Sequence, residues 1–127
     1  DRIDIWVQVA DIDYKKLAGV GTGEKTDAIK KRVLSARNKQ RQRFTNHKKN
    51  ISTNAEMNVK DLAVNAQLAP KVRDLLDQSA EKLQLSPRAY HRIIKLARTI
   101  ADLANANEIE TTHILEALQY RPKLEQY

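Results

Sequence analysis

The sequence predicts a mainly α-helical domain, a bundle of about five helices preceded by one isolated β-strand and a glycine-containing linker. Three observations predict this. Apolar residues recur at helical spacing through most of the chain after residue 26. Strict alternation of apolar and polar residues is confined to residues 3–9, and Gly19, Gly21 and Gly23 lie between the two regions. Because only 5% of the residues are aromatic, we expect a core of Leu, Ile, Val and Ala.

The predicted strand has one apolar face, made of Ile3, Ile5, Val7 and Val9. No later segment resembles a second strand, and a strand without a neighbour cannot satisfy its backbone hydrogen bonds. We therefore expect that its sheet lies outside this chain and that the chain is a piece of a longer protein. Residues 1–25 would then be the end of a preceding core and a linker, residues 26–121 the helical domain, and residues 122–127 a tail.

Helix boundaries are marked by caps and prolines. Thr26 is a predicted N-cap for a long basic helix that ends near Phe44, and Asn58 with Asp61 predicts a capping box for a short helix. Pro70 and Ser86-Pro87 open two further helices, and a last one begins at about Thr111. The expected buried face of the first helix is Ile29, Val33, Gln40 and Phe44.

The net charge of +7 comes from one segment. Between Lys30 and Lys49 the sequence has nine basic residues and no acidic one, whereas the rest of the chain has 14 basic and 16 acidic residues. The nine are Lys30, Lys31, Arg32, Arg37, Lys39, Arg41, Arg43, Lys48 and Lys49. Nucleic acid, an acidic protein surface, or no partner at all are the interpretations of this segment. For nucleic acid, the candidate contacts are Lys30, Lys31, Arg37, Arg41, Lys48 and Lys49, and backbone contact is favoured because no aromatic residues are interleaved.

Other chemistry is poorly supported. The segment 19–26 is glycine-rich, but Glu24 stands between Gly23 and Lys25, so it does not match a phosphate-binding P-loop. The chain lacks cysteine, no two of its three histidines have an i, i+4 spacing, and no metal site is predicted. No apolar run approaches the roughly 20 residues that span a bilayer, so we expect no membrane partner and a cytoplasmic location.

Arg88 lies in the first turn of the helix that Ser86-Pro87 opens, where the helix dipole favours an anion. Arg92 and Lys95 continue a basic stripe along the same helix. By pattern alone, this stripe is either a solvated helix face or an anion site.

The segment from Leu85 to Leu103, LSPRAYHRIIKLARTIADL, resembles the signature of the magnesium-chelatase-like, competence-associated AAA+ ATPases. The closing segment 116–121, EALQYR, and the opening segment 1–5, DRIDI, resemble the same family, and the segments 41–44 and 54–57 match it more loosely. Pro87 stands where the family is expected to have a small residue, but a proline suits the first turn. The resemblance implies the helical C-terminal lid of such an ATPase.

The resemblance also implies roles. Arg88 would correspond to the sensor arginine of the lid that contacts the γ-phosphate, and Arg2 to the arginine finger that reaches the nucleotide of a neighbouring subunit. ATP and Mg²⁺ would be bound mainly by residues outside this chain, which by itself is not expected to be an enzyme. The implied partners are the upstream ATPase core, neighbouring subunits of a homo-oligomeric, hexameric ring, and DNA.

Three functions follow. The leading one is the lid of a DNA-processing motor in competence and recombination. The first alternative is the lid of a magnesium chelatase subunit that drives metal insertion into a porphyrin. The second alternative is a stand-alone helical module that binds nucleic acid.

Overall fold

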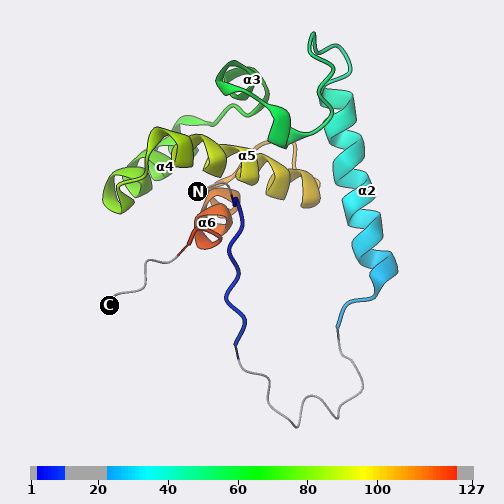
Figure 1. The fold of residues 1–127 in the computed structure, drawn as a ribbon, viewed down its shortest axis with the longest axis horizontal. Helices are drawn as coiled ribbons and strands as arrows, with labels where there is room; N and C mark the ends of the chain where they lie inside the picture. The colour runs from blue at the N-terminus through cyan, green and yellow to red at the C-terminus, as the bar shows by residue number, and fades with distance from the viewer. Residues whose placement is uncertain (1–2, 11–22, 123–127) are drawn as a thin grey trace.

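A computed structural model of the chain describes residues 3–10 and 23–122. Helix α5, Pro87–Leu103, lies at the centre of the fold. Helices α2, Thr26–Arg43, α3, Val59–Asn65, and α6, Thr111–Gln119, pack against it, as does the short 3-10 helix η1, Asn54–Glu56 (Figure 1). Helix α4, Pro70–Leu83, packs against α6. The mainly helical prediction is therefore confirmed for the described residues.

The core is aliphatic, as the composition predicts. Helix α5 buries Ile93, Ile94, Ala97 and Ala101 on one face, at the helical spacing seen in the sequence. The other buried apolar side chains come from every neighbouring element and include Phe44, Met57, Leu62, Val72, Leu76, Ile109 and Ile114. Leu115 is 48% exposed, because α6 turns its Ile114 and Ala117 face toward the core.

Most of the predicted helix starts are correct. Asn58 and Asp61 form the reciprocal capping box of α3, and Pro70 and Pro87 occupy the first turns of α4 and α5. Thr26 is the exception. Helix α2 already begins at Thr26, so Lys25 is the N-cap and no side chain caps this end.

Helix α2 packs only through its C-terminal half. Ala36, Gln40 and Phe44 are buried, but Ile29 and Val33, on the same stripe, are 43% and 40% exposed. The prediction that Ile29 and Val33 lie in the core is thus wrong. The physical reason is visible in Figure 1, where the N-terminal half of α2 extends beyond the end of α5, so the bundle offers it nothing to pack against.

The predicted strand is not found. Residues 3–10 are extended, but they form no ladder with another strand, because the described residues contain no second strand. Their apolar side chains stay exposed, from 44% for Trp6 to 81% for Val9. The backbone N–H of Trp6 donates to the carbonyl oxygen of Tyr120 at 2.7 Å, so the segment touches the end of α6. Arg2, Gly19 and Gly21, and the tail from residue 123, lie outside the described residues.

A buried carboxylate joins three elements of the fold. The Asp102 side chain on α5 is fully buried and accepts two hydrogen bonds from Arg43 on α2, at 2.7 and 2.9 Å. Asn54 of η1 and Arg98 of α5 also donate to it, at 2.9 and 3.1 Å. Asn54 in turn is held by Gln40 and Thr99. We call Gln40, Arg43, Asn54, Arg98, Thr99 and Asp102 the Asp102 network.

The electrostatics of the network keep Asp102 ionised. Burial alone would raise the pKa of Asp102, but the hydrogen bonds from Arg43 and Asn54 and the nearby guanidinium charges lower this pKa below the usual range. Burial also lowers the pKa of Arg98, partly against the attraction of Asp102. Arg98 remains a cation at neutral pH, because guanidinium groups do not lose their proton in proteins.

We expect Asp102→Asn to lower the free energy of unfolding by about 3–5 kcal/mol, because it leaves the buried guanidinium of Arg98 and the partly buried one of Arg43 without a carboxylate. Urea unfolding followed by circular dichroism measures this. Asp74→Asn is the matched control, since Asp74 is exposed on α4. Equal losses in the two variants would show that the network does not stabilise the fold.

Acid should destabilise the wild-type chain through the same group. Because the pKa of Asp102 is lower in the folded state, its stabilising contribution is complete above the unfolded value, about pH 4, and is lost as the pH falls toward the folded value. Urea unfolding at several pH values between 7 and 2 should therefore show a steeper acid loss for the wild type than for Asp102→Asn. Parallel curves for the two would contradict this.

Candidate functional site

Arg88 is presented at one end of the central helix. It is the second residue of α5, its side chain is exposed, and the 17 residues of this helix give it a well-developed dipole. The predicted anion-facing position is therefore accessible. Contact between Arg88 and a nucleotide stays a prediction.

Two residues beside Arg88 have no backbone N–H group available to a ligand. Pro87 has no N–H, and the N–H of Ala89 donates to the Ser86 hydroxyl at 3.1 Å. Two of the first three positions of this helix, Pro87 and Ala89, therefore offer no free amide to an anion. An anion at this position would be held mainly by the Arg88 guanidinium, which can offer two parallel hydrogen bonds to phosphate oxygens.

The two basic residues that follow Arg88 on this helix face, Arg92 and Lys95, contact other parts of the chain. Arg92 Nε lies 3.0 Å from Asp4 Oδ1, and Lys95 Nζ donates to the carbonyl oxygen of Ala55 at 3.3 Å. Asp4 belongs to the segment that also contains Arg2 in the sequence, so that segment reaches α5 one turn from Arg88. The candidate finger, Arg2 itself, lies outside the described residues.

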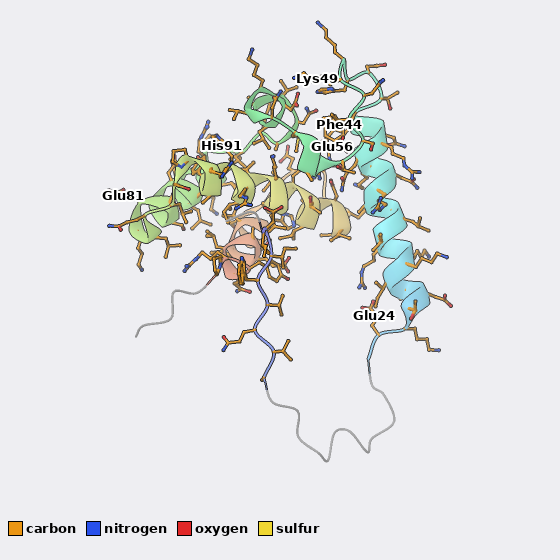
Figure 2. The ribbon with its side chains drawn as sticks, in the orientation of Figure 1. Glu24, Phe44, Lys49, Glu56, Glu81 and His91 are labelled. Atoms are coloured by element: carbon orange, nitrogen blue, oxygen red, sulfur yellow. The ribbon has the colours of Figure 1, made fainter. Side chains whose placement is uncertain are left out.

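The nine basic residues between Lys30 and Lys49 differ in their ion-pair partners and in their exposure. Arg32 pairs with Glu24, and Arg43 belongs to the Asp102 network. Lys39 is half-buried. The six candidate nucleic-acid contacts, Lys30, Lys31, Arg37, Arg41, Lys48 and Lys49, are all exposed. They extend from near Glu24 at one end of α2 to Lys49 beyond the other (Figure 2).

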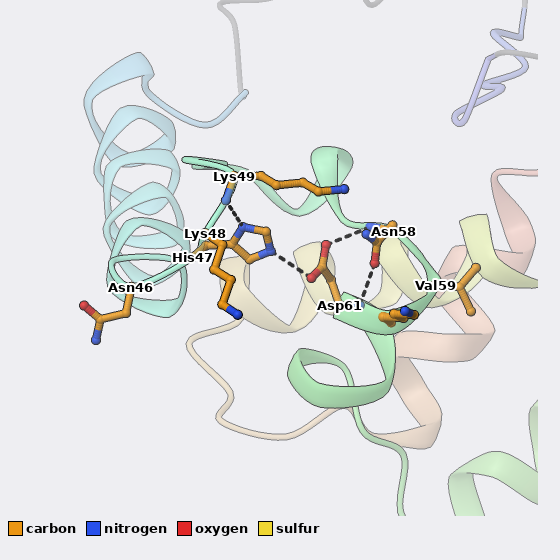
Figure 3. A pocket seen from close by; sticks show the side chains of 8 residues that line it. Asn46, His47, Lys48, Lys49, Asn58, Val59 and Asp61 are labelled. Atoms are coloured by element: carbon orange, nitrogen blue, oxygen red, sulfur yellow. Dashed lines mark hydrogen bonds and ion pairs between the residues drawn. The ribbon is translucent and has the colours of Figure 1, made fainter.

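His47 fixes the loop that carries Lys48 and Lys49. Its Nδ1 accepts the N–H of Lys49 at 3.1 Å, so its proton is on Nε2, which donates to Asp61 at 2.8 Å (Figure 3). Asp61 is at the same time the capping residue of α3, and its pKa is lowered chiefly by the Asn58 backbone N–H and next by His47. Together with Lys60, these residues line a shallow surface hollow.

The other two histidines are also structural. His91 packs edge-on against Tyr90, and the Nδ1 of buried His113 accepts the N–H of Glu110 at the start of α6. Among residues 3–10 and 23–122, no group of three His, Cys, Asp or Glu side chains could hold a metal ion. These residues therefore offer no group of side chains that fits a Mg²⁺ site. No helix of the described part is long and apolar enough to cross a bilayer.

Sequence reasoning missed the Asp102 network. Two signals were present. Gln40 is a polar residue at a position where the spacing of the α2 stripe requires a buried side chain, and Arg98 precedes Asp102 by four residues, the spacing of a helical ion pair. Asn54 gave no physical signal of its burial, because the residues around it are mostly polar and follow no helical or strand pattern.

Comparison with known proteins places the chain in a family. Residues 23–121 match the family described as "Magnesium chelatase, subunit ChlI C-terminal". The chain is 36% identical, over 95% of its length, to "Competence protein ComM" of Haemophilus influenzae, and covers 23% of that protein. It is 35% and 32% identical, over 78% of its length, to "Uncharacterized protein YifB" of Salmonella typhimurium and of Escherichia coli. In each of these two it covers 18% of the protein, so it spans about a fifth of the length of such relatives.

We expect Ser86→Ala to lower the free energy of unfolding by about 1 kcal/mol, because the hydroxyl that caps the turn of Arg88 is lost. Ser79→Ala, within α4, is the control and should be neutral or slightly stabilising, since alanine has the higher helix propensity. Urea unfolding of both variants measures the difference. If Ser86→Ala were as harmless as Ser79→Ala, the cap would not hold this turn.

Proposed function

This chain belongs to the family of magnesium chelatase subunit ChlI C-terminal domains, and from this premise we propose that it is the C-terminal lid of a ring-forming AAA+ ATPase. The lid would close over ATP bound by a core in the residues that precede it. The observation that carries this proposal is the exposed Arg88 in the capped first turn of the central helix. A guanidinium exposed at a helix start is in a position where the helix dipole favours an anion such as a phosphate.

ATP bound with Mg²⁺ to the core would supply the phosphoryl group that is transferred to water. Negative charge spreads over the oxygens of that group in the transition state, and the planar guanidinium of Arg88 is suited to stabilise it with two hydrogen bonds. Arg2 would do the same for the nucleotide of a neighbouring subunit. In this proposal the chain contributes to ATP hydrolysis through positively charged side chains that stabilise the transition state. It does not supply a general base or metal ligands.

The fold suits the lid for coupling. Arg88 and Asp102 lie on the same helix 14 residues apart, about 21 Å along its axis. The network at Asp102 ties this helix to the end of α2 through Arg43. A displacement of Arg88 by the phosphate would therefore move α5 and α2 together, as one body.

We propose that the motor acts on DNA. The relative that is 36% identical is named a competence protein, which supports a role in the handling of DNA during transformation. The family description supports a second candidate, the lid of a magnesium chelatase. ATP hydrolysis by the complete protein separates the two, since DNA should stimulate the first and a porphyrin the second.

In the complete protein that carries this domain, Arg88→Ala should lower the rate of ATP hydrolysis by about 10²-fold or more, because transition-state charge loses a preorganised donor. Lys71→Ala is the matched control, because Lys71 follows the first-turn proline of α4 as Arg88 follows that of α5. It should leave hydrolysis unchanged. A steady-state assay measures both, and wild-type turnover in Arg88→Ala would remove Arg88 from the nucleotide site.

A further inference from the structure

We infer that the exposed basic residues of α2 and the following loop form a contact surface for the phosphate backbone of a nucleic acid. This basic surface consists of Lys30, Arg37 and Arg41 on the helix and Lys48 and Lys49 in the loop. All five side chains are exposed, and no acidic residue occurs between the first and the last of them. Arg32 and Arg43 are not part of it, because they form ion pairs with Glu24 and Asp102.

The three residues on α2 share one helix face. Lys30, Arg37 and Arg41 follow one another at i, i+7 and i+11, so they lie in a row along the axis. The row is about 16 Å long at 1.5 Å per residue. Since one strand of a duplex presents a phosphate about every 3.4 Å of its axis, the row spans about five phosphates. Lys31 lies roughly 100° round the helix and falls outside the row.

The surface is accessible and its far end is held in shape. The N-terminal half of α2 stands clear of the bundle, with Leu34 in the same row 50% exposed (Figure 1). At the other end, the backbone N–H of Lys49 is fixed by His47, which is itself held by Asp61. Lys48 and Lys49 are therefore exposed on a loop whose backbone is held in place beyond the C-terminal end of α2.

The chemistry fits backbone contact and not base recognition. Phe44, the aromatic residue of this segment, is 4% exposed and therefore cannot stack on a base. Lysine and arginine side chains without an aromatic neighbour bind phosphates whatever the base sequence. Exposed Ile29 lies roughly a quarter-turn round the helix from the row, whereas exposed Val33, four residues before Arg37, borders the row.

This inference rests on the proposed function in taking DNA as the substrate of the motor, but it is tested without ATP. The 127-residue chain is titrated with a labelled DNA duplex and with a single strand at several salt concentrations. We expect a Kd on the order of 10⁻⁴–10⁻⁶ M that is independent of base sequence. Arg37→Gln with Arg41→Gln should reduce the salt slope on the duplex by about two, because about 0.9 of a counterion is released per contacted phosphate.

The control pair is Lys71→Gln with Lys82→Gln, two exposed lysines of α4 that remove the same charge. It should keep the wild-type slope, and circular dichroism should show both pairs folded. Equal slopes for the two pairs, or no binding by the wild type at low salt, would overturn the inference. So would displacement of the duplex by polyglutamate as effectively as by unlabelled DNA, because the surface would then fit an acidic protein. Arg88→Ala should bind DNA as the wild type does. The role of Arg88 at the nucleotide is tested by ATP hydrolysis, so the two proposals can fail independently of each other.

Discussion

The fold depends on one buried carboxylate. Asp102 is removed from water and is surrounded by donors from three elements, with the two guanidiniums of Arg43 and Arg98 beside it. A buried charge is tolerable only when its hydrogen bonds are satisfied, and this requirement fixes where α2 ends relative to α5 and η1. Arg98 also donates to the carbonyl oxygens of Ala106 and Asn107, so the same site orders the loop that leads to α6.

This constraint places the two candidate functional surfaces relative to each other. Arg88 is at the start of α5, and the basic surface runs along α2, which reaches α5 through the network near the end of that helix. The aliphatic core between them holds the helices together but is not directional. The network is directional, because the hydrogen bonds from Arg43 and Asn54 to Asp102 require particular distances and angles. A lid that relays a nucleotide contact to a second surface would require such a rigid connection.

Local signals in the sequence were sufficient for much of the fold and insufficient for the network. The Asn58 box, the first-turn prolines and the apolar stripe of α5 act within one helix, and a pattern of neighbours in sequence contains them. The burial of Ile29 and Val33 depended on how far α5 extends, which no local pattern encodes. The prediction of a strand at residues 3–9 was not confirmed for a related reason. Alternation of apolar and polar residues indicates a preference for a sheet but cannot supply the neighbouring strand. The place of Arg88 in the first turn of a helix was predicted from the neighbouring Ser86 and Pro87. The partners of Arg43 were not predicted, because Asp102 is 59 residues away.

The central claim is that Arg88 faces the phosphates of bound ATP. A structure of the complete protein with a non-hydrolysable ATP analogue tests it most directly. The account predicts that the guanidinium nitrogens of Arg88 lie about 3 Å from oxygens of the γ-phosphate in the closed subunits, with the bundle unchanged. A closed, nucleotide-bound subunit in which Arg88 points into solvent would contradict it.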